Sequence, residues 1–369
     1  MLRTLIAAVC TFLNVPALMT VAPVVAQSTS GRAGDGGLIT AVFSGATVLA
    51  ELSMPSLMGR IRPGRLFAIA LALIGGGSLA HLLSGTSSPW MMLLAAVRGL
   101  GFGTAVVTGA VLVTELAPSG ARGRAIGNLG LAIGGASMVS PSLGLLLLSS
   151  FGPNVVFALT GTIALVGIFA VDSVDRGLPR PVTRPIQVTE GLREPGLAIP
   201  VAALALLTVT YGGLVSYGAL VLDPVGWGSA ASFFFLYGAG RAVSRWLAGR
   251  GADRLGARRV ILPGMGLALV GLLLLTLTAR REPLFVALAG LLYGGGAGMA
   301  QSAAFVGMLG RAKQTQVPLV STLWNLAYDG GVSIGGAALG VLAATSGETA
   351  VLWSLTPVAA VAFLLFLLF

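Results

Sequence analysis

The chain has 369 residues, of which 56% are hydrophobic and only 9% are charged. A soluble globular domain carries charge on roughly a quarter of its residues, so this composition excludes that class and indicates a chain surrounded by lipid. The formal net charge of +10 would indicate a nucleic-acid partner in a soluble protein, but the basic residues here lie between apolar runs, where they set membrane topology and predict no nucleic-acid partner.

Twelve apolar runs follow one another along the chain, and each is long enough to span a membrane. A helix needs about 20 apolar residues to cross about 30 Å of hydrocarbon. The sequence therefore predicts an all-α integral membrane protein with twelve transmembrane helices. The approximate ranges of the predicted spans are 4–26, 37–59, 66–84, 89–116, 124–149, 153–171, 198–222, 229–248, 260–279, 283–310, 317–344 and 349–369.

Many of the 54 glycines lie inside these predicted spans, as in the stretch GLGFGTAVVTGA at 99–110. Glycine weakens a helix in water, but in lipid it lets the backbones of two helices approach closely. We therefore expect these glycines to mark contacts between helices. The alternating ten-residue strands of a membrane β-barrel are not visible in the sequence.

The first span has a second interpretation. Arg3, an apolar run and the stretch VVAQ, with Val24 and Ala26 at the small-residue positions, also fit a cleaved signal peptide. Cleavage would leave eleven spans and would break the internal symmetry described below. The run is also long for the core of a signal peptide, so we predict that it is a transmembrane helix.

The basic residues predict the orientation of the chain. With the N-terminus in the cytoplasm, most of the 22 lysine and arginine residues fall in cytoplasmic loops, and Arg32, Arg280 and Arg281 fall in outer loops. This distribution follows the positive-inside rule and places both termini in the cytoplasm. The longest loop, about 172–197, is then cytoplasmic, and its proline-rich, charged composition is typical of a linker.

The sequences on the two sides of this linker resemble each other. We predict an N-terminal six-helix bundle over 1–171, the linker over 172–197 and a C-terminal six-helix bundle over 198–369. The loop LMGRIRPGRL matches GRGADRLGARR when Gly64 is aligned with Gly256, and GLGFGTA (99–105) matches YGGGAGMA (293–300). Two such parallel repeats predict a substrate site at their interface, near the middle of the membrane.

The chain resembles the major facilitator superfamily over nearly all of its length. The fourth span keeps the family pattern Arg-x-x-Gly-x-Gly-x-Ala, and the loop after the eighth span keeps Gly-x-x-x-Asp-Arg-x-Gly-x-Arg-Arg in full. The residues that match are Arg98, Gly101, Gly103 and Ala105 in the first motif and Gly249, Asp253, Arg254, Gly256, Arg258 and Arg259 in the second. The resemblance implies the major facilitator fold, with two pseudo-symmetric six-helix bundles.

Two other motifs depart from the family pattern. The antiporter signature Gly-Pro-x-x-Gly-Gly of the fifth span reads Ser-Pro-Ser-Leu-Gly-Leu here, over 140–145. In the loop after the second span, Leu57 and Ile61 stand where the family has Gly and Asp. These departures weaken the assignment as an antiporter and leave the predicted fold unchanged.

We interpret the motif at 249–259 as a gating loop on the cytoplasmic side. Gly249 and Gly256 would allow a tight turn between two helices, and Asp253 can pair with nearby arginines and interact with helix ends. Such contacts would hold that side closed in one state and break in the other. The alternative is that the arginines only fix the topology.

Charged residues inside spans are costly and usually face a cavity or a partner. Glu51, Arg98, Arg241 and Asp329 lie near the middle of their spans, and Arg245 lies one turn from Arg241 on the same helix face. Each predicted bundle therefore has an acid and a base at mid-depth.

Asp329 belongs to a polar stripe in which a polar residue recurs every fourth position, from Ser321 through Asn325 and Asp329 to Ser333. We expect this stripe to face the transport cavity and Asp329 to bind a substrate group or a coupling proton, with Arg241 or Arg245 as its partner. The alternative is a fixed ion pair that holds two spans together.

Arg98 occupies the fourth-span arginine of the family, which the resemblance implicates in proton transfer in proton-coupled exporters. A fixed cation tunes how readily a neighbouring carboxyl group takes up a proton, and Glu51 is the acid that we expect in this half. The alternative is a static bridge between Glu51 and Arg98.

The resemblance also implies which spans line the substrate cavity, although aromatic side chains on them can serve as ordinary packing. Candidate cavity residues are Asn14, Tyr211, Gln301, Trp324 and Asn325. Two further residues have predicted structural roles. Pro141 should bend the fifth span, and the lone His81 is interpreted as a hydrogen-bonded histidine near the membrane interface rather than as a proton relay.

These features predict a secondary transporter of the bacterial inner membrane that works by alternating access. The motifs look most like those of proton-coupled exporters of drugs or metabolites. One alternative is an uptake symporter or facilitator for a small polar solute. Another is a non-transporting sensor or partner subunit with a transporter fold, against which the charges at mid-depth argue.

No cofactor and no metal are expected. The single cysteine, Cys10, excludes an internal disulfide and a thiolate cluster, and the single histidine excludes a His-rich metal site. No Gly-x-Ser-x-Gly or phosphate-loop pattern is present, so we predict that the chain is not an enzyme. The expected partners are a small-molecule substrate, a proton and the lipid bilayer, and the expected state is a monomer.

Overall fold

The computed structural model describes residues 1–84, 87–117, 122–171, 188–222, 227–278, 282–313 and 316–369. Within these residues the chain forms thirteen helices and no strand, so the predicted all-α class is confirmed. The chain divides into two compact units, which are Met1–Ser30 with Val42–Pro185 and Gly31–Ala41 with Ile186–Phe369. We call them unit 1 and unit 2.

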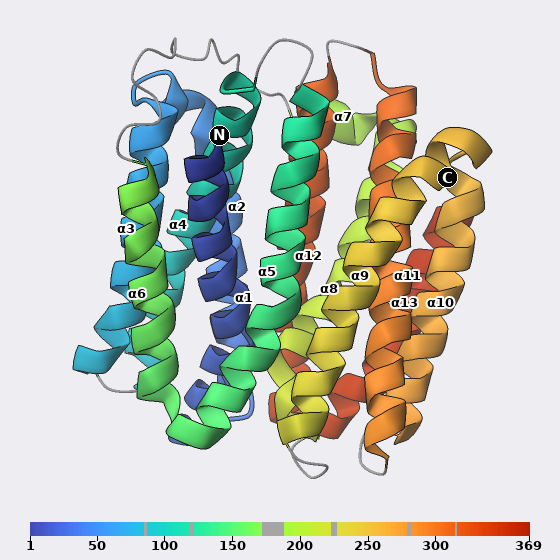
Figure 1. The fold of residues 1–369 in the computed structure, drawn as a ribbon. Helices are drawn as coiled ribbons and strands as arrows, with labels where there is room; N and C mark the ends of the chain where they lie inside the picture. The colour runs from blue at the N-terminus through green and yellow to red at the C-terminus, as the bar shows by residue number, and fades with distance from the viewer. Residues whose placement is uncertain (85–86, 118–121, 172–187, 223–226, 279–281, 314–315) are drawn as a thin grey trace. The chain divides into compact units, whose positions relative to one another are not determined.

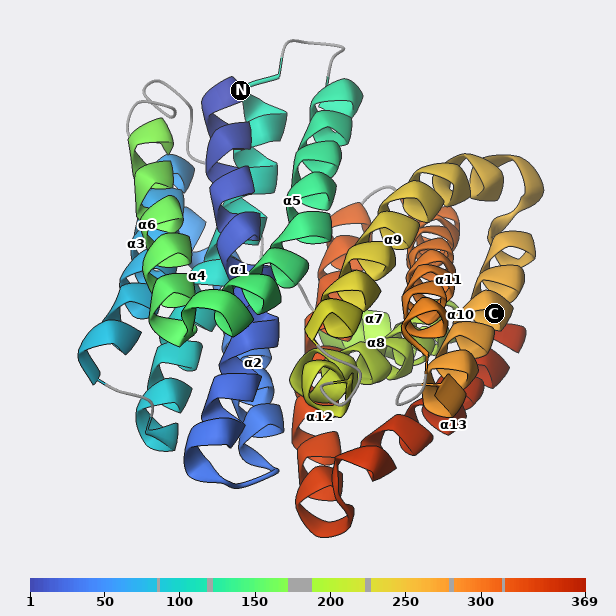
Figure 2. The ribbon, with the colours of Figure 1, turned by 60° about the horizontal axis from the view of Figure 1, so that its bottom comes forward.

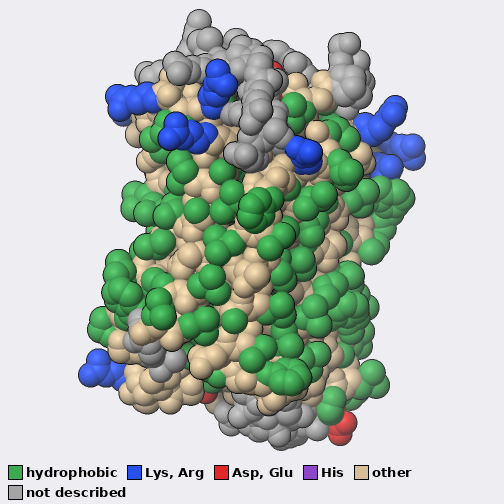
Figure 3. Space-filling model, turned by 60° about the vertical axis from the view of Figure 1, so that its left-hand side comes forward, with side chains coloured by type: hydrophobic (Ala, Val, Ile, Leu, Met, Phe, Trp, Pro, Cys, Tyr) green, Lys and Arg blue, Asp and Glu red, His purple; other side chains and the backbone are tan. Residues whose placement is uncertain are grey.

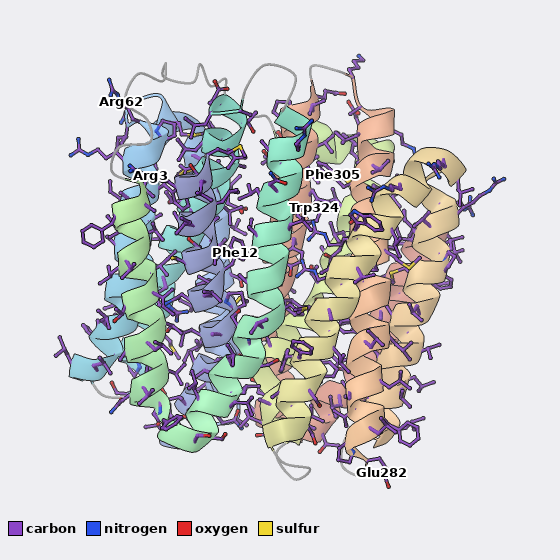
Figure 4. The ribbon with its side chains drawn as sticks, viewed as in Figure 1. Arg3, Phe12, Arg62, Glu282, Phe305 and Trp324 are labelled. Atoms are coloured by element: carbon purple, nitrogen blue, oxygen red, sulfur yellow. The ribbon has the colours of Figure 1, made fainter. Side chains whose placement is uncertain are left out.

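Unit 1 is built from the first six helices (Figure 1). They are α1 (Leu2–Ser30), most of α2 (Asp35–Met58), α3 (Pro63–Ser84), α4 (Ser88–Glu115), α5 (Arg122–Phe151) and α6 (Pro153–Val171). Helix α3 packs against α4 and α6, and α1 packs against α5 and α6. Arg3 and Arg62 lie at the same end of unit 1 (Figure 4), as expected if two spans separate their positions.

Unit 2 contains the remaining helices together with the first turns of α2. They are α7 (Val188–Arg193), α8 (Pro195–Leu222), α9 (Trp227–Leu255), α10 (Ala257–Thr278), α11 (Pro283–Arg311), α12 (Val317–Ser346) and α13 (Glu348–Leu367). Helix α10 packs against α11 and α13, α8 packs against α12 and α13, and α11 lies against α9. Figure 2 shows α9, α11 and α10 side by side.

The two units use the same helix pairings. The contacts of α3 with α4 and α6 in unit 1 have their counterparts in the contacts of α10 with α11 and α13 in unit 2. The contacts of α1 with α5 and α6 correspond in the same way to those of α8 with α12 and α13. This shared topology is the structural form of the sequence repeat, and it confirms the prediction of two pseudo-symmetric bundles.

Each predicted span corresponds to one long helix, and the main differences concern two connections. Helix α7 lies within 172–197, which was predicted as a linker, while 172–187 lies outside the described residues. Helix α9 continues to Leu255, whereas the predicted span ended at 248. The turn after it is made by Gly256, whose φ of +88° is a backbone conformation that favours glycine.

The outer surface of the helices suits lipid. Among the described helices, eleven are long and apolar enough to cross a membrane, and α9 falls outside this group because its polar and charged residues lower its hydrophobicity. Large apolar side chains point outward, including Leu83 at 92% exposure and Phe169 at 83%. Figure 3 shows hydrophobic side chains across the middle of one face and Lys and Arg side chains toward its ends.

Glycines allow the closest helix contacts inside each unit. In unit 1, Gly99 and Gly103 of α4 lie against backbone carbonyls of α2. In unit 2, Gly290, Gly294 and Gly298 of α11 lie against the carbonyls of Phe233, Tyr237 and Arg241 on α9. The spacing of four residues puts these glycines on one helix face, so backbone meets backbone as expected for glycine inside membrane helices.

We predict that Gly294→Ala destabilises the protein, whereas Gly295→Ala does not. A Cβ atom at position 294 would overlap the Tyr237 carbonyl, which cannot move without separating α9 from α11. A Cβ atom at position 295 would make an ordinary contact of 3.5 Å with the Leu267 side chain. Overpacking of this kind costs about 1–3 kcal/mol. Thermal unfolding in detergent measures the difference, and equal stability of the two variants would contradict the close contact.

Candidate functional site

Two arginines of α9 lie over aromatic rings of α12. The guanidinium carbon of Arg241 is 5.1 Å from the centroid of the Tyr328 ring, and that of Arg245 is 5.7 Å from the centroid of Trp324. Arg241 and Arg245 are one helical turn apart, as are Trp324 and Tyr328, so the two pairs repeat along the helices. An aromatic face attracts a cation and partly replaces the water that a guanidinium loses on burial.

Gln301 of α11 forms hydrogen bonds with one residue of α9 and one residue of α12. Arg241 donates a hydrogen bond from Nε to the Gln301 side-chain oxygen at 3.3 Å, and Trp324 donates from Nε1 to the Gln301 backbone oxygen at 3.2 Å. Gln301 is buried. Its amide and carbonyl groups therefore fix the positions of an arginine on α9 and an indole on α12.

Asp329 lies beside this cluster and is only 9% exposed. Arg241 is the cation that acts electrostatically on its carboxyl group. Asp329 follows Tyr328 in the chain, and the Tyr328 ring is 5.1 Å from the guanidinium carbon of Arg241, so Asp329 lies near one of the two partners expected for it, and their pairing remains a prediction. Ser333 of the polar stripe donates a hydrogen bond to the Ala41 backbone oxygen at 2.8 Å, so this part of the stripe faces the first turns of α2.

Aromatic rings continue from this point through the unit. Phe305 and Trp324 are in contact at 6.0 Å between ring centroids (Figure 4). Further contacts of 5.2–6.3 Å join the rings in the order Trp324, Tyr328, Tyr211, Tyr237 and Tyr293. We call these six residues the ring cluster. It draws side chains from α8, α9, α11 and α12.

The site is only partly enclosed. Arg245 is exposed, and Arg241, Trp324 and Tyr328 are half-buried. Deeper in the cluster, the Tyr293 hydroxyl shares a hydrogen bond of 2.8 Å with Thr210, while the Tyr237 hydroxyl is buried without a hydrogen-bond partner among the described residues. A ligand can therefore reach the arginines, and a polar group is free to bond at the inner end.

Most of the predicted residues of this half lie together. The residues found in or beside the ring cluster are Tyr211, Arg241, Arg245, Gln301, Trp324 and Asp329. Asn325 is half-buried and follows Trp324 in the chain. Four further residues of the site were not predicted from the sequence: Tyr237, Tyr293, Tyr328 and Phe305. The chain has only five tyrosines, and Tyr237 lies one turn from Arg241 while Tyr328 adjoins Asp329. Tyrosines at helical spacing from charged residues were the available signal.

Arg98 is the buried charge of unit 1. It is 2% exposed, and its guanidinium carbon is 5.6 Å from the centroid of the Phe43 ring. Phe43 packs on Phe102, which in turn packs on Phe12 of α1 at 5.4 Å (Figure 4). The Nε and Nη2 atoms of Arg98 have no hydrogen-bond partner among the described residues, so this cation is held by rings and retains free donors.

The structure does not place Glu51 at the level of Arg98. Gly99 lies against the Phe43 carbonyl, and Thr47 donates a hydrogen bond to the Gly99 backbone oxygen at 3.2 Å. In this register Arg98 is level with Phe43, and Glu51 lies two turns further along α2, which is about 12 Å at 1.5 Å per residue. The pairing expected between them is therefore not formed in this structure.

Asn14 and His81 lie in the same unit as Arg98. Asn14 donates a hydrogen bond to the Ser78 hydroxyl at 2.9 Å. His81 is stacked on Phe157 at 4.2 Å, and neither ring nitrogen has a hydrogen-bond partner among the described residues. The hydrogen bonds expected for His81 are therefore not found among the described residues, because packing against α6 buries the ring, and its position near the interface stays a prediction.

The predicted gating motif is mostly helical. Gly249, Asp253 and Arg254 lie in α9, Gly256 alone makes the turn, and Arg258 and Arg259 lie in the first turn of α10. Gly249 therefore does not form the turn that was expected of it. Arg254, Arg258 and Arg259 are exposed. The side chain of Asp253, and with it the expected pairing with arginines, lies outside the described residues.

Pro141 lies inside α5, which is curved along its length (Figure 1). The neighbouring Ser140 donates a hydrogen bond to the Phe12 backbone oxygen at 3.0 Å, and Gly144 lies against Ala17. These contacts attach the proline-containing part of α5 to α1. A bending role for Pro141 remains a prediction.

Two bundles with repeated topology and buried charges agree with a comparison against family models. The model described as Major Facilitator Superfamily matches residues 4–335 and again 230–369. The chain belongs to this family. The residues that carried the resemblance in the sequence, Arg98 in α4 and the motif around Gly256, lie inside the matched ranges.

Several solved structures of the major facilitator superfamily share the fold. A bacterial homolog of the human lysosomal transporter Spinster, in an inward-facing and occupied conformation, has a TM-score of 0.84 and 15% identity, with 100% of this chain and 95% of that chain covered. The nucleoside transporter NupG has a TM-score of 0.78 and 13% identity, with 99% and 98% covered. The human organic anion transporter MFSD10 (TETRAN) has a TM-score of 0.69 and 16% identity, with 99% and 98% covered.

At these identities the likeness shows the fold alone. No curated protein sequence matches the chain significantly. Membership of the major facilitator superfamily makes the chain a multi-pass membrane protein and a secondary transporter rather than an enzyme. The substrate, the direction and the coupling ion have to be argued from the residues of the site.

Two tyrosine variants test the geometry of the ring cluster. Tyr293→Phe removes the hydrogen bond to Thr210 and should lower stability by about 1 kcal/mol. Tyr237→Phe removes a hydroxyl that has no hydrogen-bond partner within the described ranges, so it should leave stability unchanged or raise it. Thermal unfolding of the two variants beside the wild type gives the comparison. A larger loss for Tyr237→Phe than for Tyr293→Phe would contradict the described geometry.

Proposed function

We propose that this protein is a proton-coupled exporter that moves a drug-like compound or metabolite across the bacterial inner membrane by alternating access. Family membership supplies the transporter class. The observation that carries the coupling is the buried Asp329 carboxyl group, which adjoins Tyr328, the residue whose ring is 5.1 Å from the Arg241 guanidinium carbon. A carboxyl group at membrane depth with a cation beside it is a suitable site for binding and releasing a proton.

The two charged groups have different roles in this proposal. When Asp329 takes up the proton, its carboxyl group becomes neutral and no longer attracts Arg241. Because Arg241 also contacts Gln301 and the Tyr328 ring, a change at Asp329 reaches the residues that line the ring cluster. Proton uptake is thereby coupled to the site that binds the substrate.

Arg98 supports the same proposal in unit 1. It is a buried cation with two nitrogen atoms that lack hydrogen-bond partners among the described residues. Free donors at membrane depth are costly unless a ligand, water or a carboxylate binds them in another state. We propose that Arg98 and Glu51 approach each other or a bound group during the transport cycle.

The proposed orientation has both termini in the cytoplasm, as the distribution of basic residues predicts. In that orientation the turn at Gly256 and the exposed Arg254, Arg258 and Arg259 lie on the cytoplasmic side, where we propose that they hold that side closed in one state. The protein would function as a monomer, with lipid around both units.

The test is an accumulation assay in a bacterium that lacks its main efflux pumps. A panel of hydrophobic drugs, sugars and small metabolites is measured with and without a protonophore. Expression of the wild type should lower accumulation of at least one compound, and the protonophore should abolish this effect. Raised accumulation would contradict export and identify an importer.

Asp329→Asn should lower this proton-driven export by about tenfold or more, because an amide cannot take up or release a proton. Glu282→Gln is the matched control, since Glu282 is an exposed acid at the start of α11 and its replacement should leave export unchanged. Folded yield is measured by size-exclusion chromatography in detergent. Loss of folded protein in Asp329→Asn would contradict the coupling role and indicate a structural ion pair.

A further inference from the structure

We propose that the site in unit 2 binds an organic anion that carries a flat ring system, and that Arg245 binds its anionic group. This inference rests on the proposed transport function, since it names the class of compound that the same site would carry. The charges near Arg245, its exposure and the rings around it support this inference.

The charge of the site favours an anionic ligand. Asp329 adjoins Tyr328, whose ring is 5.1 Å from the guanidinium carbon of Arg241, so its carboxylate can compensate one of the two positive charges. The groups that act electrostatically on Arg245 are Arg241, Tyr328 and Tyr237, and no described carboxylate is among them. One positive charge at membrane depth is therefore left for a ligand to neutralise. A charge inside a membrane span is costly without a counter-charge, so an anionic ligand gains the most from this position.

The two arginines differ in how accessible they are to a ligand. Arg241 is half-buried and already donates a hydrogen bond to Gln301. Arg245 is exposed, and its contact is with the face of Trp324. A guanidinium over a ring face still has N–H groups available at its edge. These donors match a carboxylate, sulfonate or phosphate with two parallel hydrogen bonds.

The arrangement of the rings favours a flat ligand. Trp324 and Tyr328 are 5.8 Å apart with an angle of 12° between their planes, so they present a nearly parallel aromatic surface one turn long. Tyr211 continues this surface at 6.3 Å from Tyr328. A flat ring can stack on such a surface. It would reach from the guanidinium of Arg245 toward the Tyr237 hydroxyl, which has no hydrogen-bond partner in the part of the chain that the structure describes.

The same features argue against a cationic ligand. Aromatic faces bind cations well, but this site already holds two cations, with Arg245 over Trp324 and Arg241 over Tyr328. A second cation would be repelled by both guanidinium groups and would find only Asp329, which is 9% exposed. A neutral ring would stack but leave Arg245 without a counter-charge.

Four probes of one shape separate these possibilities. They are 2-naphthoate, which has charge and ring; decahydro-2-naphthoate, which has the charge without aromaticity; 2-naphthalenemethanol, which is neutral; and 2-naphthylmethylamine, which is cationic. Binding to the purified protein in lipid nanodiscs is measured by titration calorimetry, with empty nanodiscs as the blank. We expect 2-naphthoate to bind at least about tenfold more tightly than each of the other three.

Arg245→Gln should weaken the binding of 2-naphthoate by about 10- to 100-fold and leave the alcohol unchanged, because only the anion uses the guanidinium. Arg250→Gln is the matched control. Arg250 lies on the same helix over the ring of Trp246 at 3.9 Å, so its replacement removes an equal charge and a similar contact outside the site. Trp324→Leu should weaken the binding of 2-naphthoate more than the binding of its decahydro analogue. Trp246→Leu should change the binding of neither probe.

Each outcome decides the inference. Tighter binding of the amine or the alcohol, equal loss in Arg245→Gln and Arg250→Gln, or no binding of any probe would overturn it. Movement of the probes is measured separately by counterflow in liposomes. If 2-naphthoate binds through Arg245 but no probe crosses the membrane, the proposed transport function fails and the ligand class stands. If the amine crosses and the acid does not, the transport function stands and the ligand class fails.

Discussion

The close contact between α9 and α11 determines where the functional groups of unit 2 lie. Because Gly290, Gly294 and Gly298 have no side chains, the carbonyls of Phe233, Tyr237 and Arg241 rest directly on the α11 backbone. Two of these three α9 residues belong to the site. The contact places the Arg241 side chain within reach of Gln301, which lies almost one turn beyond Gly298 on α11. Any side chain on this glycine face would separate the helices and move the arginine away from its partner.

Once α9 is held there, the charges on it need compensation inside a bundle whose other surfaces are apolar. The Tyr328 ring and the Gln301 side chain provide it for Arg241, whereas Arg245 has a ring and an open side. Unit 1 handles its cation differently, since Arg98 lies over Phe43 and keeps nitrogen atoms without hydrogen-bond partners among the described residues. The repeated topology thus holds two chemically different charge sites, one rich in tyrosine and partly open, the other phenylalanine-lined and buried.

The fold could be predicted closely from the sequence, because length and hydrophobicity alone identify a membrane helix. The charged motif at 249–259 misled the prediction of the helix end, since arginines in water extend a helix as readily as they form a loop, and only Gly256 required a turn. Helical spacing identified Asp329, Arg241 and Arg245 but not their aromatic neighbours. Spacing tells which residues share a face of one helix, and it says nothing of which face another helix presents. Glu51 and Arg98 were both at mid-depth in the sequence, yet the register of α2 against α4 separates them.

The most direct test of the account is whether water and substrate reach α12 from both sides of the membrane. The chain has one cysteine, so Cys10→Ala gives a cysteine-free background for Asn325→Cys, at a half-buried position of the polar stripe. Ile334→Cys, at a side chain that is 59% exposed on the same helix, is the lipid-facing control. A charged thiol reagent, applied to cells and to inverted vesicles, should label Asn325→Cys from both sides and label Ile334→Cys from neither, because the thiolate forms only in contact with water. No labelling of Asn325→Cys from either side would contradict a transport path along the Asp329 stripe.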